Sequence, residues 1–162
     1  MTAKPPIVCF ALLLLASCRP AGPPAPPPDR MPRFTLKDVD GREFSSEELR
    51  GKVALVDFWM TTCEPCRREM PGFEQLQNEY RDRGLVVIGI ALDEDTAEVS
   101  RFARELGVHY RLLLSNQEVQ ERWGGIQGIP TTFLVDRNGV VRKKVIGFEY
   151  KEEFEKALRE LL

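Results

Sequence analysis

A short apolar run that leads into two closely spaced cysteines constrains this chain more than any other stretch. Residues 53–56 (Val-Ala-Leu-Val) predict a buried strand, which a polar Thr-Thr pair ends a few residues later. Pro65 suits the first turn of a helix, where its missing N–H costs nothing and its fixed φ favours the helical conformation. We therefore expect Cys63 at or just before a helix N-terminus, with Cys66 one turn further on the same face.

This placement of the cysteines predicts disulfide chemistry. Unpaired N–H groups and the positive end of the helix dipole favour a thiolate at Cys63, the nucleophile of disulfide exchange. Cys66 is close enough to resolve the mixed disulfide that forms. Half of a zinc site is one alternative, but zinc needs four ligands, and beyond residue 18 only Cys63, Cys66 and His109 are soft ligands. An inert structural disulfide is another, although so short a loop removes little chain entropy. We expect no metal, and we expect His109 to be a surface or packing residue.

Two segments resemble a known family. Residues 57–71 are similar to the active site of thioredoxin-like thiol–disulfide oxidoreductases of the TlpA/ResA type, bacterial lipoproteins of the AhpC/TSA-redoxin superfamily. Residues 128–136 (Gly-Ile-Pro-Thr-Thr-Phe-Leu-Val-Asp) resemble the cis-proline loop of that family and the strand after it. The resemblance covers about residues 33–162. It implies an α/β, thioredoxin-like fold with an N-terminal β-hairpin and a central strand–helix insertion at about 93–114.

The expected catalytic residues are Cys63, Cys66, Asp57 and Glu64. Asp57 occupies the position of the buried acid behind the thioredoxin motif, where desolvation would raise its pKa and let it exchange a proton with Cys66. A solvated aspartate at the sheet edge is the alternative. Glu64 is expected to oppose the thiolate and so keep the couple reducing, unless its side chain points to water and shifts the equilibrium little.

Four residues are expected to contact a client protein: Trp59, Pro65, Ile129 and Pro130. The resemblance implies that Ile129 and Pro130 form a cis-proline loop that faces the cysteines and helps to hold a substrate strand. Trp59 is expected beside the motif, where it would shape the docking surface. The resemblance also implies clients with paired cysteines, such as apocytochrome c, and a membrane electron donor of the DsbD/CcdA kind. No organic cofactor is required.

The N-terminal residues are typical of a secretory signal. Lys4 precedes a short apolar core that is too short to span a bilayer as a helix. Residues 15–18 (Leu-Ala-Ser-Cys) resemble a lipobox, which implies cleavage before Cys18 and lipidation of its thiol. The alternative is ordinary signal cleavage with Cys18 left as a free thiol. Lipidation would anchor the protein to a bacterial membrane on the extracytoplasmic, periplasmic side, where disulfides form readily.

The predicted organisation follows from these segments. Residues 1–18 form the signal peptide and lipobox, residues 19–32 a linker, and residues 33–162 a thioredoxin-like domain. The linker holds seven of the twelve prolines, so it is either an extended polyproline-II tether or a disordered spacer. The formal net charge of −2 and the absence of a basic sequence run argue against nucleic-acid binding. A monomer is the default expectation.

Hydrophobic periodicity and turn residues predict the elements of the domain. A hairpin turn at Asp40-Gly41 precedes a capping box over residues 45–48. Strands are expected at 53–58, 85–92 and 112–114, and at 131–135 and 140–146, which form a hairpin. Helices are expected at about 64–81, from about residue 96 to Gly107, and at 118–123 and 152–162.

Other functional classes stay open from sequence alone. A thiol peroxidase would need a threonine–proline setting around its reactive cysteine, and here Thr62 is adjacent but no proline precedes the motif at the required place. A copper-handling module would need a wider spacing between its cysteines, with methionine or histidine as further copper ligands. A non-catalytic domain with an inert disulfide is the third alternative.

Overall fold

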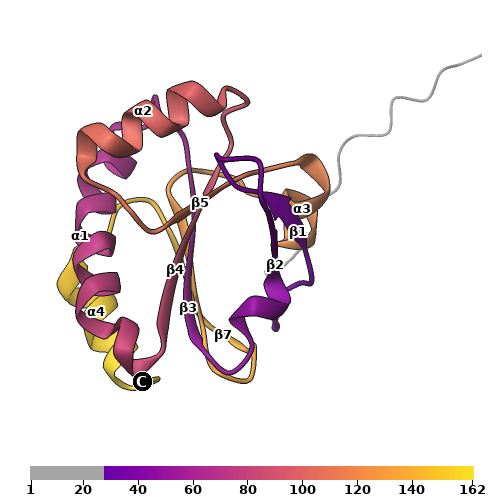
Figure 1. Cartoon of the computed structure of the whole chain (residues 1–162). Coiled ribbons are helices and arrows are strands. Elements are labelled where there is room, and N and C mark those ends of the chain that lie inside the picture. Colours follow the sequence, from indigo (N-terminus) through magenta and orange to yellow (C-terminus); the bar gives the residue numbers. More distant parts are fainter. Residues whose placement is uncertain (1–27) are drawn as a thin grey trace, which may run out of the picture.

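The computed structural model of the chain describes residues 28–162 (Figure 1). The predicted signal peptide, the lipidation site at Cys18 and most of the predicted linker lie outside these residues. The strands are β1 (Thr35–Lys37), β2 (Glu43–Ser45), β3 (Val53–Trp59), β4 (Leu85–Ala91), β5 (Arg111–Leu114), β6 (Thr131–Val135) and β7 (Val141–Ile146). The helices are α1 (Glu64–Tyr80), α2 (Thr96–Leu106), α3 (Gln117–Arg122) and α4 (Lys151–Arg159), with 3-10 helices η1 (Ser46–Leu49) and η2 (Arg81–Arg83).

A five-stranded mixed sheet in the order β5-β4-β3-β6-β7 forms the centre of the domain. β3, β4 and β5 run parallel, whereas β6 is antiparallel to β3 and β7 is antiparallel to β6. A separate two-stranded sheet contains the predicted N-terminal hairpin, β1 and β2. The unit of α2 and β5 is the predicted central insertion, and β5 extends the sheet beyond β4. The expected thioredoxin-like α/β fold is therefore confirmed.

Alternate residues of β3 enter two different cores, because successive side chains of a strand point to opposite faces. Leu55 and Trp59 pack in the core beneath α1, α2 and α4. Val56 and Phe58 pack in the core beneath the N-terminal hairpin and α3. Figure 1 shows α1 and α4 on one side of the sheet, with β1, β2 and α3 on the other. Asp57 has the parity of Leu55 and Trp59, so its side chain is directed toward α1.

Contacts of the N-terminal segment shift one predicted boundary. The carbonyl of Asp29 accepts the N–H of Val141 at 3.0 Å, and the N–H of Met31 donates to Gly139 at 2.8 Å. The folded domain therefore includes residues that were expected in the linker, because these residues pair with the β6–β7 turn. Helix ends also differ slightly from prediction: α1 ends at Tyr80 and continues as the 3-10 turn η2.

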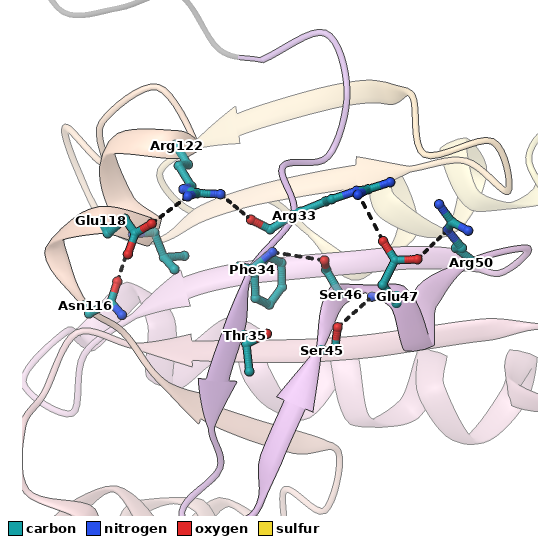
Figure 2. Close-up of a pocket in the computed structure, with 11 residues that line it drawn as sticks. Arg33, Phe34, Thr35, Ser45, Ser46, Glu47, Arg50, Asn116, Glu118 and Arg122 are labelled. Carbon is teal, nitrogen blue, oxygen red and sulfur yellow. Dashed lines mark hydrogen bonds and ion pairs between the residues drawn. The ribbon is translucent and has the colours of Figure 1, made fainter.

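The capping box after the hairpin is confirmed. Ser45 caps η1 by accepting the N–H of Glu47, and Glu48 accepts the N–H of Ser45 at 3.0 Å. The buried hydroxyl of Ser46 accepts the N–H of Phe34 at 3.0 Å and joins η1 to the start of β1 (Figure 2). These bonds hold η1 and the hairpin together over one face of the sheet.

The helices of residues 28–162 include none that is both long and apolar enough to cross a membrane.

Candidate redox site

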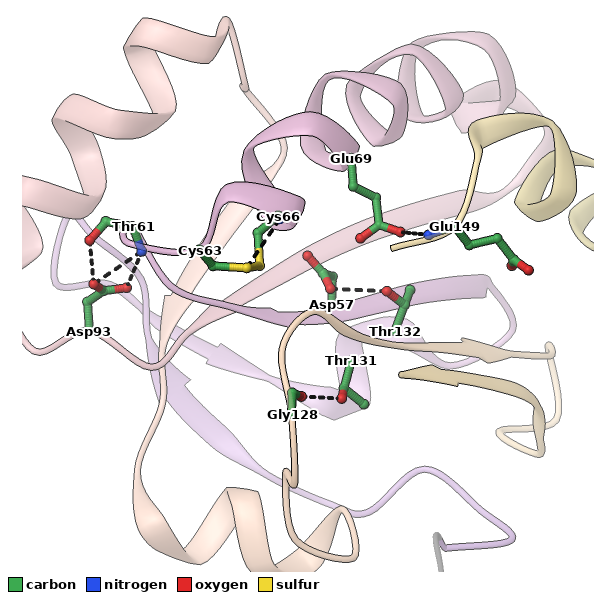
Figure 3. The surroundings of a disulfide bond; sticks show 10 residues. All are labelled: Asp57, Thr61, Cys63, Cys66, Glu69, Asp93, Gly128, Thr131, Thr132 and Glu149. Atoms are coloured by element: carbon green, nitrogen blue, oxygen red, sulfur yellow. Dashed lines mark hydrogen bonds between the residues drawn. A yellow bond between two sulfur atoms is a disulfide. The ribbon is translucent and has the colours of Figure 1, made fainter. Parts of the chain in front are cut away.

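The two cysteines lie where the sequence predicts. Cys63 and Cys66 form a disulfide with their Cα atoms 5.3 Å apart (Figure 3). Cys63 is the N-cap of α1, its Sγ accepts the N–H of Cys66 at 3.2 Å, and Pro65 follows in the first turn. Cys63 is 8% exposed, whereas Cys66 has no exposed surface. A thiol or disulfide from another protein would therefore reach the Cys63 sulfur first.

The loop that enters the motif is fixed by the loop after β4. The carboxylate of Asp93 accepts the N–H of Thr61 at 3.0 Å and its hydroxyl at 2.6 Å (Figure 3). The N-cap of α2 is Asp95, which accepts the N–H groups of Ala97 and Glu98. Because Thr61 is two residues before the first cysteine, its bonds to Asp93 position the cap of α1.

The proline loop lies next to the cysteines. The Ile129–Pro130 bond is cis, as the resemblance implied. Pairing of β6 with β3 places this loop beside the end of β3 that leads to the motif. Ile129 is partly buried and packs against the core cluster that contains Cys63 and Cys66. The carbonyl of Pro130 accepts the N–H of Gly147 at 2.8 Å, which ties the loop to the chain after β7.

Asp57 is fully buried beneath the disulfide, as predicted. Its Oδ1 accepts the hydroxyl of Thr132 at 3.1 Å, and its Oδ2 has no hydrogen-bond partner among the described residues. Burial raises the pKa of Asp57 from 3.8 to about 7, and the bond from Thr132 offsets part of that rise. The alternative of a solvated aspartate at the sheet edge is therefore wrong.

A second buried carboxyl group faces the same region. Glu69 is one helical turn after Cys66 and is 4% exposed. Its Oε1 accepts the N–H of Glu149 at 3.2 Å, and its Oε2 has no partner among the described residues. Burial and, to a smaller extent, the charge of Asp57 raise the pKa of Glu69 from 4.5 to about 8. Figure 3 shows the Glu69 and Asp57 carboxyl groups turned toward one another below Cys66.

Asp57 and Glu69 therefore titrate as a pair. Two buried carboxylates close together repel, so ionisation of one makes ionisation of the other harder. Around neutral pH the pair holds a proton that it can give or take within the protein interior. This is the property that a proton donor and acceptor for a buried thiol needs.

Trp59 lies in the same core cluster as the two cysteines, but it is absent from the surface that it was expected to shape. Its side chain has no exposed surface and stacks on Phe102 of α2, with ring centroids 5.3 Å apart. A Cβ at Gly89 would lie 2.9 Å from the Trp59 Nε1 and 3.2 Å from the ring of Tyr110. Only a glycine therefore leaves room for both rings beside Asp57, its partner in the β3–β4 register. Trp59 supports the site from within the core instead of forming its docking surface.

The charged residues around the motif lie toward solvent. Glu64 is exposed in the first turn of α1, which matches the alternative in which its carboxylate points to water. Arg67 pairs with Glu105 at 3.7 Å, and Arg68 lies 4.5 Å from the ring centroid of Phe148. Both arginines therefore contact other elements of the domain.

His109 occupies the exposed surface, with its Nδ1 3.5 Å from Glu74. Within residues 28–162, no group of three or more histidine, cysteine or acidic side chains converges as a metal site.

Sequence reasoning missed Glu69 as a functional residue. A charged residue on a helix is usually solvent-exposed, so its residue type offered no reason to separate Glu69 from the polar face of α1. Its spacing held the signal: Cys66, Glu69, Met70 and Phe73 recur at helical period and all are buried. Tyr110, whose buried hydroxyl has no partner among the described residues, also lies near this pair and was not singled out.

Comparisons with known proteins agree with this geometry. The family model described as Redoxin matches residues 26–161. The thiol-disulfide oxidoreductase ResA of Geobacillus thermodenitrificans is 34% identical over 130 residues, which cover 80% of this chain and 75% of that protein. The thioredoxin-like protein YneN of Bacillus subtilis is 32% identical and covers 78% of this chain and 75% of that protein. A crystal structure of a thioredoxin-family thiol:disulfide interchange protein from Chlorobium tepidum superimposes with a TM-score of 0.76 at 32% identity, covering 88% of this chain and 99% of that one.

A disulfide at the N-terminus of α1, beside a cis-proline loop on this fold, defines a thiol–disulfide oxidoreductase. The chain belongs to the redoxin family, and several of its relatives are thiol-disulfide oxidoreductases named ResA. Exchange between the Cys63–Cys66 pair and a second disulfide or dithiol is the activity that the site and the relatives support.

Proposed function

We propose that the protein is a membrane-anchored, extracytoplasmic reductant of disulfides in client proteins. One observation carries this proposal: the partly exposed Cys63 caps α1 above a buried carboxyl pair that can take a proton from the hidden Cys66. Glu64 supports the proposed direction of electron transfer, from this protein to its client. Its negative charge near Cys63 disfavours the Cys63 thiolate, and a less stable reduced form makes the couple less oxidising. Water around the exposed Glu64 weakens that effect.

The proposed exchange has two steps. The Cys63 thiolate attacks one sulfur of the client disulfide, which forms a mixed disulfide and releases the second client sulfur as a thiolate. Cys66 then gives its proton to the Asp57–Glu69 pair and attacks the Sγ of Cys63. The client leaves with both sulfurs reduced, Cys63 and Cys66 become a disulfide, and two electrons have passed to the client. The proton on the pair returns to solvent or to a client thiolate.

A partly apolar surface beside the proline loop supports client binding. Ile146 and Tyr150 are the large apolar side chains with most exposure among the described residues. Ile146 pairs with Thr131 in the sheet register, next to Pro130, and Tyr150 packs edge-on against Phe148 at 5.1 Å. We expect an extended client segment to lie across this surface with Ile129 and Pro130 beneath it and Pro65 at its edge.

The client class and the anchor are parts of the same proposal. Apocytochrome c is the proposed client because it presents paired cysteines that must be reduced before haem attachment, and the ResA-named relatives make this choice the natural one to test. A membrane thiol carrier of the DsbD/CcdA kind is the proposed electron donor. Cys18 is the proposed lipid attachment site, which Cys18→Ala would test by releasing the protein from the membrane fraction.

The reduction potential of the Cys63–Cys66 couple tests the direction of transfer. We expect a value near that of thioredoxin, about −270 mV, instead of the roughly −120 mV of a strong oxidant. A potential in the oxidant range would reverse the assigned role. Client identity is tested by Cys66→Ser, which should trap mixed disulfides through Cys63 in cells, with Cys63→Ser/Cys66→Ser as the control that traps none.

A further inference from the structure

Two adjoining hollows cross the side of the domain where the described chain begins. The larger, of about 610 Å³, lies between the hairpin, η1 and α3, and the smaller, of about 450 Å³, continues toward the β6–β7 turn. They share Arg33, Ser46, Glu47 and Arg50, so we treat them as one feature, the arginine groove. Figure 2 shows the residues that line the larger hollow. The proposed redox machinery contributes no residue to its lining.

The charge of the groove is opposite to that of the domain. Five arginines line it, Arg30, Arg33, Arg50, Arg122 and Arg137, against the two carboxylates of Glu47 and Glu118, which gives a formal charge of +3. The whole chain carries −2, of which Lys4 and Arg19 contribute +2, so residues 28–162 carry −4. An acidic domain thus concentrates positive charge on one side.

The guanidinium groups at the centre are held in place but not neutralised. Glu47 accepts both Arg33, through Nε at 3.3 Å, and Arg50, through Nε at 2.7 Å. One carboxylate therefore contacts two positive groups through their Nε atoms, and both arginine side chains are largely exposed (Figure 2). Arg122 is oriented by Glu118 at 2.6 Å and by the carbonyl of Arg33 at 2.9 Å. Guanidinium forks presented in this way match phosphate oxygens.

The groove also adjoins the point where the proposed membrane tether joins the domain. Arg30 pairs with Val140 of the β6–β7 turn and donates to the carbonyl of Asn138 at 2.6 Å. Gly51, which lines the groove, lies just before the start of β3, whereas Cys63 lies just after the end of that strand. β3 spans roughly 20 Å at 3.3 Å per residue, so this end of the groove and the redox pair lie at opposite ends of the central strand.

We propose that the arginine groove docks the domain onto the anionic phospholipid headgroups of the membrane that carries its tether. This inference rests on the proposed membrane anchor. The occupant is argued from two observations: the charge of the groove is complementary to phosphate groups, and the described chain begins beside the groove, where Arg30, Met31 and Pro32 line it. A lipid anchor on the preceding residues would bring this side of the domain to the membrane. Docking would direct the Cys63 end of β3 away from the bilayer, toward client proteins. Each basic residue near an anionic surface strengthens partitioning about 5-fold.

Vesicle cosedimentation of the full chain tests the proposal. The probes are vesicles of phosphatidylcholine alone and vesicles that also contain phosphatidylglycerol, so the ratio of the two partition coefficients cancels any insertion of the N-terminal apolar residues. Arg33→Gln/Arg50→Gln should lower this ratio about 20-fold. Arg101→Gln/Arg104→Gln, which removes two exposed α2 arginines and the same charge, should lower it less than about 2-fold. Salt at about 0.5 M should abolish the preference for anionic vesicles.

Three results would overturn the proposal: an equal loss in both double variants, no loss in the groove variant, or displacement of the protein by inorganic phosphate at matched ionic strength. The last would identify an isolated phosphate site instead of a lipid-docking surface. Disulfide reduction by the same variants is measured in parallel and should be unchanged, which shows that they are folded. Because the vesicle assay involves no redox step, failure of docking is distinguishable from failure of the proposed reductase activity.

Discussion

Carboxyl groups in two regions of the protein have opposite surroundings. Glu155 on α4 accepts Tyr80 at 2.7 Å, Arg159 at 2.6 Å and Lys151 at 3.2 Å, and these bonds lower its pKa to about 2. Among the described residues, no cationic side chain forms a hydrogen bond with Asp57 or Glu69 beneath the disulfide. Each of these two carboxyl groups has one oxygen atom without a hydrogen-bond partner there. Burial raises both pKa values toward neutrality.

The difference separates a structural role from a chemical one. Glu155 is ionised at every physiological pH, so it can join α1 to α4 but cannot exchange protons. Ionisation of the buried pair destabilises the fold, because the surrounding structure keeps both carboxyl groups away from water. A group that titrates near neutrality is what general acid–base chemistry on Cys66 requires.

The largest expected effect is on turnover. Asp57→Asn/Glu69→Gln should slow resolution of the mixed disulfide about 100-fold at pH 7, because Cys66 loses its proton acceptor. The release of a labelled client peptide after rapid mixing measures this step. Glu155→Gln, the same chemical change outside the site, should leave the rate unaltered. Equal slowing in both variants would remove the distinction between the two regions.

Stability should depend on pH in a direction set by the buried pair. The folded-state pKa values are raised, so the folded state binds protons more tightly than the unfolded chain. The stabilising contribution is then fully present below about pH 4 and is lost as pH rises through 7 to 8. Urea unfolding of the oxidised protein measures the difference in stability between Asp57→Asn/Glu69→Gln and the parent. From pH 4 to pH 8.5 this difference should move in favour of the variant by at least about 3 kcal/mol. A constant difference across that range would contradict the raised pKa values.

Crowding around Gly89 gives an effect of intermediate size. A methyl group there would lie 2.6 Å from Leu112 Cδ2 and 2.9 Å from Trp59 Nε1, so Gly89→Ala should destabilise the protein by about 2 kcal/mol through overpacking. The same change should also alter the pH dependence of resolution, because Asp57 is the β3 neighbour of Gly89. Combination with Leu112→Ala should be less destabilising than the sum of the single changes. Strict additivity would show that the two residues do not share this space.

The smallest expected effect is at Glu155, and its pH dependence has the opposite sign. The folded-state pKa is lowered, so its contribution is present above about pH 4.5 and is lost as pH falls toward 2. Glu155→Gln should cost about 1 kcal/mol at pH 7, since Arg159, one of its three partners, is 63% exposed and therefore screened by solvent. Thermal unfolding at pH 7 and at pH 2.5 measures the destabilisation that Glu155→Gln causes at each pH. A larger destabilisation at pH 2.5 would contradict a stabilising role for the ionised Glu155 carboxylate.

Local sequence patterns predicted most of the fold and part of the site. The strand from residue 53 and the helix cap at Cys63 are properties of a few neighbouring residues, and the structure has them as expected. The burial of Glu69 depends on Glu149, 80 residues away, and the burial of Trp59 depends on Phe102 of α2. Such contacts are set by how distant elements pack, which no local pattern contains.

The arginine groove shows the same limit. Its lining comes from the N-terminal segment, η1, α3 and the β6–β7 turn, and the arginines are scattered along an acidic sequence. The net charge of the chain argued against nucleic-acid binding and gave no sign of a local basic surface. Only the fold brings Arg33 and Arg50 to the same carboxylate.

The pH dependence of mixed-disulfide resolution tests the central claim most directly, namely that the Asp57–Glu69 pair accepts the Cys66 proton. Client release from the Cys63 mixed disulfide, followed from pH 5 to pH 10, should accelerate through a midpoint between about 7 and 8. In Asp57→Asn/Glu69→Gln this midpoint should disappear, leaving only a rise at higher pH from the thiol itself. Superimposable profiles for the two proteins would contradict the account.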